Sequence, residues 1–237
     1  MLKKHQSFSL IELLLVITIL FVLATLLQPS LKRVLSQSQD LKCQTNLKQL
    51  LMGMQIYTDN NDDVIMPFAL PQGEKAWFHL NNWTGILLKE VFNLSYSKNR
   101  FDSVEDFKTA SCPNSDQRFG YGHNYRYLGA QKDSTNWLIK HKITEATLPQ
   151  NTTFLVDNML TEQSSWGVSK NEWEHSWRSF VRPGGISFQD NRVNFTHTNE
   201  STNVGWLDGH VSARYMGDGF YQPGSEETNK KWWALIK

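Results

Sequence analysis

The chain has 237 residues, enough for one ordinary domain and an anchor but few for two large domains. It carries 24 basic and 23 acidic residues, so it lacks the strong positive field of nucleic-acid-binding proteins, and nucleic acid is not an expected partner. The N-terminal segment is strongly apolar, whereas the remainder is polar and rich in aromatics, so the low mean hydropathy does not exclude a membrane segment.

A short basic segment and a long apolar run open the chain. Residues 1–7 read MLKKHQS, and residues 8–27 read FSLIELLLVITILFVLATLL. In a helix this run spans about 30 Å, the thickness of the hydrocarbon core of a bilayer. A buried core helix is the competing interpretation. It is disfavoured because the run stands at the extreme end of a chain that is otherwise poor in aliphatic residues.

The charges around the run predict its orientation. Lys3 and Lys4 precede it and favour a cytoplasmic N-terminus with an exported remainder, although Lys32 and Arg33 after it weaken that preference. A cleaved signal peptide would have a shorter apolar region followed by small residues, and the segment 24–26 (ATL) is a poor cleavage site. We therefore expect a single-pass transmembrane anchor.

Glu12 is the acidic residue within the run, and a carboxylate near the bilayer centre costs about 2.5 kcal/mol or more unless it has a partner. The basic leader, the residues FSLIE at 8–12 and the long apolar helix together resemble the type IV prepilin signal of pilins and of type II secretion pseudopilins. The resemblance implies that a prepilin peptidase cuts between Ser7 and Phe8, that the new amine is methylated, and that Glu12 pairs with the terminal amine of a neighbouring subunit. This chain has Ser7 where the family normally has Gly.

The resemblance also implies a function and a location. We expect a pilin- or pseudopilin-like structural subunit, not an enzyme, in the bacterial inner membrane with a periplasmic or extracellular C-terminal domain. Its implied partners are the prepilin peptidase, other pilin-like subunits, the lipid bilayer and secretion machinery. The expected parts are a leader (1–7), a transmembrane helix (8–28) with a kink-forming Pro29 just after it, a helical stem (29–60) and a soluble extracytoplasmic domain (61–237).

The stem continues the helix, because its apolar residues recur at three- and four-residue spacings and so form one apolar face. We predict one helix from Phe8 to about Thr58, whose second half packs on the soluble domain. The apolar face comprises Leu31, Val34, Leu35, Leu47, Leu50, Leu51, Met54 and Tyr57, and the opposite face comprises Lys32, Arg33, Gln37, Gln39, Lys42, Gln44, Lys48 and Gln49.

The segment 59–63 (DNNDD) is interpreted as a polar helix stop. Asp59, Asn61 and Asp63 have the alternate spacing of calcium-loop ligands, but Val64 replaces the required Gly and Leu70 replaces the final Glu. Calcium binding is therefore the minor alternative.

The rest of the chain predicts an antiparallel sheet with loop-rich insertions, and so an α+β fold with the long helix packed on the sheet. Asp208-Gly209 lies between two β-like runs and is a strong hairpin signal, because Gly accepts positive φ. The predicted strands are 152–156, 193–196, 204–207 and 210–215, and the predicted short helices are 81–92 and 103–109.

Cys43 and Cys112 match no zinc pattern, since neither has a second cysteine or histidine two to four residues away. In an exported domain they predict a disulfide that closes a loop of about 70 residues and stabilises by roughly 4 kcal/mol. Two unpaired thiols are the alternative. No cofactor or metal is expected.

The resemblance extends along the chain in the order of several short motifs. These are Cys43-x-x-Asn46-Leu47, Cys112-Pro113, Tyr121-Gly122-x-Asn124, His197, Asn203-Val204 and Asp208-Gly209-His210-Val211. The gap from His197 to Asp208 is one residue longer than the family's usual gap. His197, Asp208 and His210 could gather as metal ligands, but the favoured interpretation is a turn carboxylate with imidazoles bonded to backbone.

No catalytic motif is present in the sequence. Trp166, Trp173 and Trp177 are aromatics that either form core or, if exposed, stack on a glycan or a protein partner. The second functional hypothesis is therefore a membrane-tethered binding module.

Overall fold

The computed structural model describes residues 9–67, 87, 112–113, 120–128, 140–159, 180–181, 192–193, 195–220 and 231–234. The chain divides into two compact units, Met1–Gln39 and Asp40–Lys237. The short helix predicted at 103–109 lies outside the described residues, as does all of the one predicted at 81–92 except Leu87.

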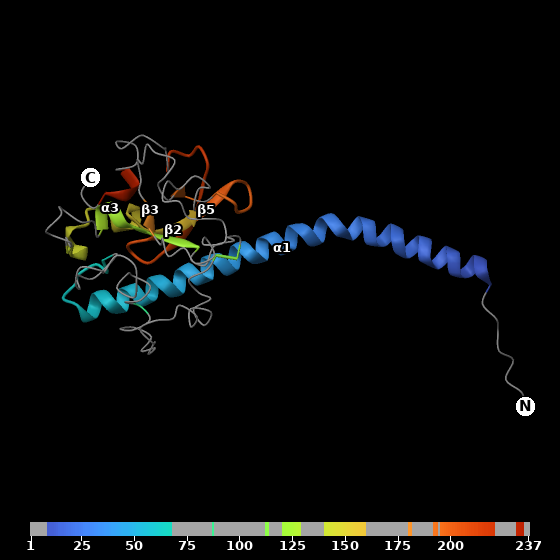
Figure 1. Ribbon diagram of the computed structural model, residues 1–237, viewed down its shortest axis with the longest axis horizontal. Coiled ribbons are helices and arrows are strands. Elements are labelled where there is room, and N and C mark those ends of the chain that lie inside the picture. Colours follow the sequence, from blue (N-terminus) through green and yellow to red (C-terminus); the bar gives the residue numbers. More distant parts are fainter. Residues whose placement is uncertain are drawn as a thin grey trace, which may run out of the picture. The chain divides into compact units, whose positions relative to one another are not determined.

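The long helix α1 spans Leu10–Asn60 and continues through Pro29, as Figure 1 shows in blue and cyan. Its apolar first part carries two hydroxyls that bond within the helix, from Thr18 to Leu15 O and from Thr25 to Val22 O, each at 2.8 Å. These side chains therefore bring no unsatisfied donor into an apolar environment.

The polar stop predicted after α1 is confirmed. The Asn61 side-chain amide donates to Tyr57 O at 2.8 Å, which satisfies one of the carbonyls that a helix end leaves open. Asp62 and Asp63 follow with φ of 53° and 62°, a left-handed conformation that ends the helix and that Asp tolerates better than most residues.

The sheet confirms the predicted α+β class. Its antiparallel part has the order β1 (Tyr121–Asn124), β2 (Thr153–Met159), β5 (Ser201–Trp206) and β6 (Val211–Tyr215). Two short strands flank it: β3 (Phe180–Val181) runs parallel to β1, and β4 (Arg192–Val193) pairs with β2. Short helical turns are α3 (Tyr125–Leu128), η4 (Ile143–Glu145) and η5 (Pro149–Asn151).

Among the predicted strands, the second (193–196) differs most from the observed one. Residues 195 and 196, placed in the strand 193–196, lie outside β4. The chain instead forms a bridge between His197 and Ser201 that leads directly into β5. Strand β5 also begins earlier than its apolar run indicated, because its polar first half is buried by tertiary packing.

The predicted hairpin at Asp208-Gly209 is confirmed. It joins β5 to β6, and Gly209 has a φ of 87°. Trp206 N donates to His210 O and Gly209 N to Trp206 O, both at 2.9 Å, which closes the turn.

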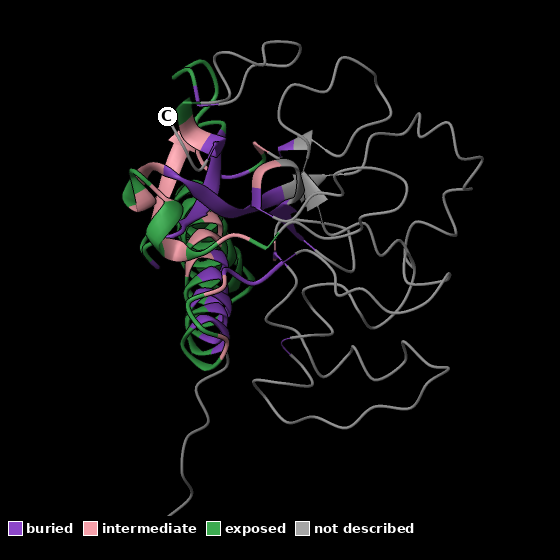
Figure 2. Cartoon of the chain, turned by 90° about the vertical axis from the view of Figure 1, so that its left-hand side faces the viewer, coloured by how far each residue is buried: buried purple, intermediate pink, exposed green. Residues whose placement is uncertain are grey.

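The core forms where the second half of α1 packs on the sheet. Figure 2 shows the buried residues in purple along α1 and the strands. Gly205 permits this contact, because a Cβ there would stand 2.9 Å from Leu51 Cδ1. This core includes Cys43, Leu47, Leu50, Leu51, Met54, Tyr121, Phe154 and Leu155, and a second cluster contains Val156, Val204, Trp206, Phe220 and Trp233.

Two residues of the polar face of the stem also contact the β5–β6 hairpin. Gln44 Nε2 donates to Asn203 Oδ1 at 3.0 Å, and Lys48 Nζ donates to Gly209 O at 2.6 Å. The apolar pattern did not predict these contacts, because it takes no account of the polar partners in the hairpin.

Candidate functional site

The first candidate site is the N-terminal end of α1. Ser9 N donates to Glu12 Oε2 at 2.9 Å, and Glu12 occupies the first helical turn. Its carboxylate therefore satisfies an amide that has no acceptor inside the helix and interacts favourably with the helix dipole. The predicted cleavage residues Ser7 and Phe8 lie outside the described residues.

The first part of α1 presents a long exposed apolar surface. Its large apolar side chains from Leu10 to Leu35 are all exposed in the single chain. One helix in the described part of the chain is long and apolar enough to cross a membrane, with a window of mean hydropathy 2.9 that is 0% buried. Such a surface is stable only when lipid or other apolar segments cover it.

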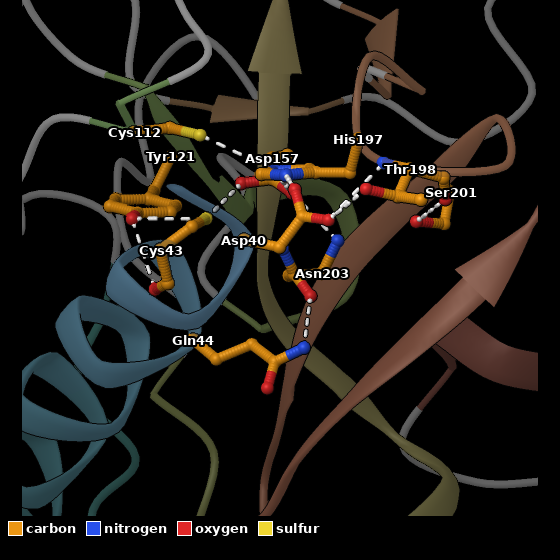
Figure 3. A network of polar contacts seen from close by, with 10 residues as sticks. All are labelled: Asp40, Cys43, Gln44, Cys112, Tyr121, Asp157, His197, Thr198, Ser201 and Asn203. Carbon is orange, nitrogen blue, oxygen red and sulfur yellow. Dashed lines mark hydrogen bonds and ion pairs between the residues drawn. The ribbon is translucent and has the colours of Figure 1, made fainter. Parts of the chain in front are cut away.

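The second candidate site is a buried cluster of polar side chains in the unit Asp40–Lys237. It brings together Cys43 from α1, Cys112, Asp157 from β2 and His197 from the turn before β5 (Figure 3). One ligand-type atom from each of the four lies within 4.8 Å of all the others, and all four residues are buried.

Three direct contacts define the centre of this cluster. Cys43 Sγ donates to Asp157 Oδ1 at 3.1 Å, and His197 Nε2 lies 2.9 Å from Asp157 Oδ2. The same imidazole nitrogen lies 3.4 Å from Cys112 Sγ. Nε2 of His197 is thus shared between a carboxylate and a sulfur.

A second layer of polar groups supports three of the four residues. The Tyr121 hydroxyl donates to Cys43 Sγ at 3.2 Å, and Asn203 N donates to Asp157 Oδ2 at 2.6 Å. On the far side of the His197 ring, Nδ1 lies 2.5 Å from Asp40 Oδ1. These contacts are drawn in Figure 3.

Local backbone features hold the cluster in place. His197 and Ser201 exchange backbone hydrogen bonds across a tight turn, in which Asn199 and Glu200 have φ of 60° and 52°. The Thr198 hydroxyl and amide both donate to Asp40 Oδ2, which holds that carboxylate beside the imidazole.

A close approach of two backbone segments positions Cys112. A Cβ added to Gly120 would stand 2.2 Å from Cys112 N, so this position requires glycine.

The charges around His197 favour its protonated form. Burial lowers the pKa of His197, but hydrogen bonds to Asp157 and Cys112 and the charge of Asp157 outweigh this effect and raise the pKa to about 11. For Asp40 the directions are reversed: burial raises the pKa of its carboxyl group, but hydrogen bonds from Thr198 and His197 outweigh burial and lower that pKa below its ordinary value.

The two thiols differ in their acidity. Burial raises the pKa of the Cys43 thiol, and the neighbouring Cys112 and Asp157 raise it further. A hydrogen bond with Cys43 lowers the pKa of Cys112, and the adjacent His197 also lowers it. The thiol beside the imidazole is therefore the one that more readily becomes a thiolate.

The site residues predicted from the sequence do not all form one common site in the described part of the chain. Cys43 and Cys112 lie together but are free thiols, so the predicted disulfide stays a prediction. His197 bonds to carboxylates, whereas Asp208 and His210 form a separate exposed pair with a contact of 2.6 Å. Trp166, Trp173 and Trp177 lie outside the described residues.

Sequence reasoning did not find this cluster. Cys43 and Asp157 are 114 positions apart, and Cys112 and His197 are 85 apart, so no local spacing connects them. The available signal was that Cys43, Cys112 and His197 all belong to the short motifs whose order resembles the family. None of those motifs contains Asp40 or Asp157.

The chain thus combines a helix whose apolar first part is exposed with a small antiparallel sheet on which the second part of that helix packs. One family model, the prokaryotic N-terminal methylation motif, matches residues 2–27. No curated protein and no solved structure matches the chain. The chain therefore carries a prepilin-type N-terminal methylation motif on a long apolar helix, as type IV pilin-like proteins do. This motif implies processing by prepilin peptidase and assembly with other pilin-like subunits.

Proposed function

We propose that the protein is a pilin- or pseudopilin-like structural subunit that assembles through α1 in a type II secretion or surface filament system. The observation that carries this proposal is the methylation motif at residues 2–27, which is continuous with the exposed apolar part of α1. Its role is to pack against other subunits, without chemistry on a substrate.

The proposed assembly step neutralises two charges. Cleavage between Ser7 and Phe8 creates a terminal amine, which would be methylated and would face Glu12 of a neighbouring subunit. Ser9 N occupies one acceptor position of the Glu12 carboxylate, and a carboxylate offers about four such positions. Burying the amine and the carboxylate together avoids leaving either charge unpaired among apolar helices.

The proposed location is the bacterial inner membrane before assembly. Lys3 and Lys4 favour a cytoplasmic N-terminus, so the unit Asp40–Lys237 would lie in the periplasm or outside the cell. The single helix capable of spanning a bilayer among the described residues supports a single-pass topology.

Mass spectrometry of the mature N-terminus from purified membranes tests the processing. We expect a chain that begins with N-methylated Phe8. An intact Met1 would contradict processing and leave a plain membrane anchor. A start near residue 27 would show ordinary signal-peptide cleavage and overturn the proposal.

A Glu12→Ala variant tests the assembly mechanism, with Thr18→Ala as the matched control in the same apolar run. Leaving the amine unpaired at a cost of about 2.5 kcal/mol corresponds to a roughly seventy-fold loss of incorporation. We expect that loss for Glu12→Ala and normal incorporation for Thr18→Ala, measured by cross-linking of subunits in membranes. Normal incorporation of Glu12→Ala would exclude charge pairing as the basis of assembly.

A further inference from the structure

We propose that Cys43, Cys112, Asp157 and His197 bind one zinc ion in a closed structural site that joins α1 to the sheet. The proposal concerns the unit Asp40–Lys237 and does not depend on the proposed assembly function.

The set of donor atoms fits zinc. Two cysteine sulfurs, one imidazole nitrogen and one carboxylate oxygen are the donor types that zinc takes in proteins, and four protein ligands make a closed structural site. Two thiolates also select against calcium and magnesium, which prefer oxygen donors.

The donors lie close enough together to surround one ion. With zinc–sulfur bonds of about 2.3 Å and zinc–nitrogen or zinc–oxygen bonds of about 2.0–2.1 Å, the edges of the tetrahedron are about 3.3–3.8 Å. The contacts to Asp157 involve both of its oxygens, with Cys43 Sγ 3.1 Å from Oδ1 and His197 Nε2 2.9 Å from Oδ2. The same nitrogen lies 3.4 Å from Cys112 Sγ. One donor atom from each of the four residues lies within 4.8 Å of the others, so movements of about 1 Å or less bring the four to these edge lengths.

The outer contacts are those expected around a metal centre. The contact of His197 Nδ1 with Asp40 directs Nε2 toward the other donors, as a carboxylate does behind many metal-bound histidines. Tyr121 donates to Cys43 Sγ and Asn203 N donates to Asp157 Oδ2, so each stabilises negative charge on a proposed ligand.

The charge of the cluster also favours a cation. Asp157 has no exposed surface, and both thiols and the His197 imidazole are buried beside it. Zinc would bind the two thiolates and the neutral Nε2 of His197, so two thiol protons and the Nε2 proton pass to solvent. The ion would replace that proton as the positive charge beside the buried Asp157. No oxidation accompanies this step.

A disulfide between Cys43 and Cys112 is the competing state of these thiols. It would connect α1 to the segment of Cys112 and remove both sulfur donors. It would leave Asp157 and His197 as a buried ion pair beside the sulfurs, each with its own outer partner. Zinc accounts for all four residues.

The first test measures the metal and the thiols of the full chain, purified in detergent without chelators and then incubated with zinc alone. We expect one zinc per chain by elemental analysis and an intact denatured mass with both thiols reduced. A mass lower by two hydrogens without zinc would establish the disulfide and overturn the proposal. Reduced thiols without bound zinc would also overturn it.

Cobalt substitution tests the geometry without altering any residue. We expect sulfur-to-cobalt charge-transfer absorption and intense visible bands, which indicate a tetrahedral site with thiolate ligands. Weak bands of an octahedral ion, without charge transfer, would contradict the assigned ligands.

An Asp40→Asn variant tests the outer contact while retaining all four ligands. We expect zinc affinity, measured by competition with a chelator, to fall 10–100-fold. The matched control is His210→Gln, which alters the exposed pair with Asp208 and should leave the affinity unchanged. Circular dichroism of both variants verifies that the chain is folded. A folded Asp40→Asn protein with unaltered affinity would contradict the assigned site.

Discussion

Stability of the domain should fall in mild acid because of one buried histidine. His123 in β1 is fully buried, and its Nε2 lies 3.0 Å from Met66 O. Its ring makes a T-shaped contact with the Phe154 ring, with 5.2 Å between the ring centroids. Burial lowers its pKa from 6.5 to about 4, although the hydrogen bond to Met66 partly opposes this shift. Between these two values the unfolded chain binds a proton that the folded chain does not, so folding stability decreases as the pH falls. The difference of about 2.5 between the unfolded and folded pKa values corresponds to about 3 kcal/mol of folding free energy. This stabilisation is lost in full below pH 4.

The assay is urea unfolding of the full chain in detergent at pH 7 and near pH 4, compared with His123→Gln. Glutamine does not titrate, and its amide can still donate to Met66 O. Other groups titrate in both proteins, so the difference between their pH dependences isolates His123. We expect the variant to lose about 3 kcal/mol less than the wild type over this range, and His210→Gln, at an exposed position, to behave as the wild type. Equal pH dependence of the wild type and His123→Gln would refute the reasoning.

Two further predictions concern the packing of α1 on the sheet. Gly205→Ala places a Cβ 2.9 Å from Leu51 Cδ1 and should destabilise the fold by about 1–3 kcal/mol in urea unfolding. A Leu51→Ala change should relieve part of that cost in the double variant, and strict additivity of the two effects would contradict the contact. Leu50→Ala, at a fully buried position, should cost about 2–5 kcal/mol, whereas Leu41→Ala, at a 64% exposed position, should change stability by less than about 0.5 kcal/mol. Equal costs at Leu50 and Leu41 would contradict the assigned face of α1.

Features decided by neighbouring residues could be predicted from the sequence. The apolar run and its continuation indicated one helix, and the observed bounds Leu10–Asn60 differ by two residues at each end from the predicted 8–58. The stop at 59–63 and the hairpin at Asp208-Gly209 were also found, because left-handed backbone conformations favour Asp, Asn and Gly. In each case the responsible interactions lie within a few positions of the chain.

The sequence by itself thus determined the membrane-type helix, the prepilin-type motif and the class of the fold. It did not show which polar residues of α1 bond to the sheet, nor that β5 has a buried polar half. The tertiary structure alone decided that Asp40 and Asp157 join Cys43, Cys112 and His197 at one buried point. The reason is physical: the approach of these side chains depends on the packing of α1 against β2 and β5, which brings Asp40 and His197 together although they are 157 positions apart.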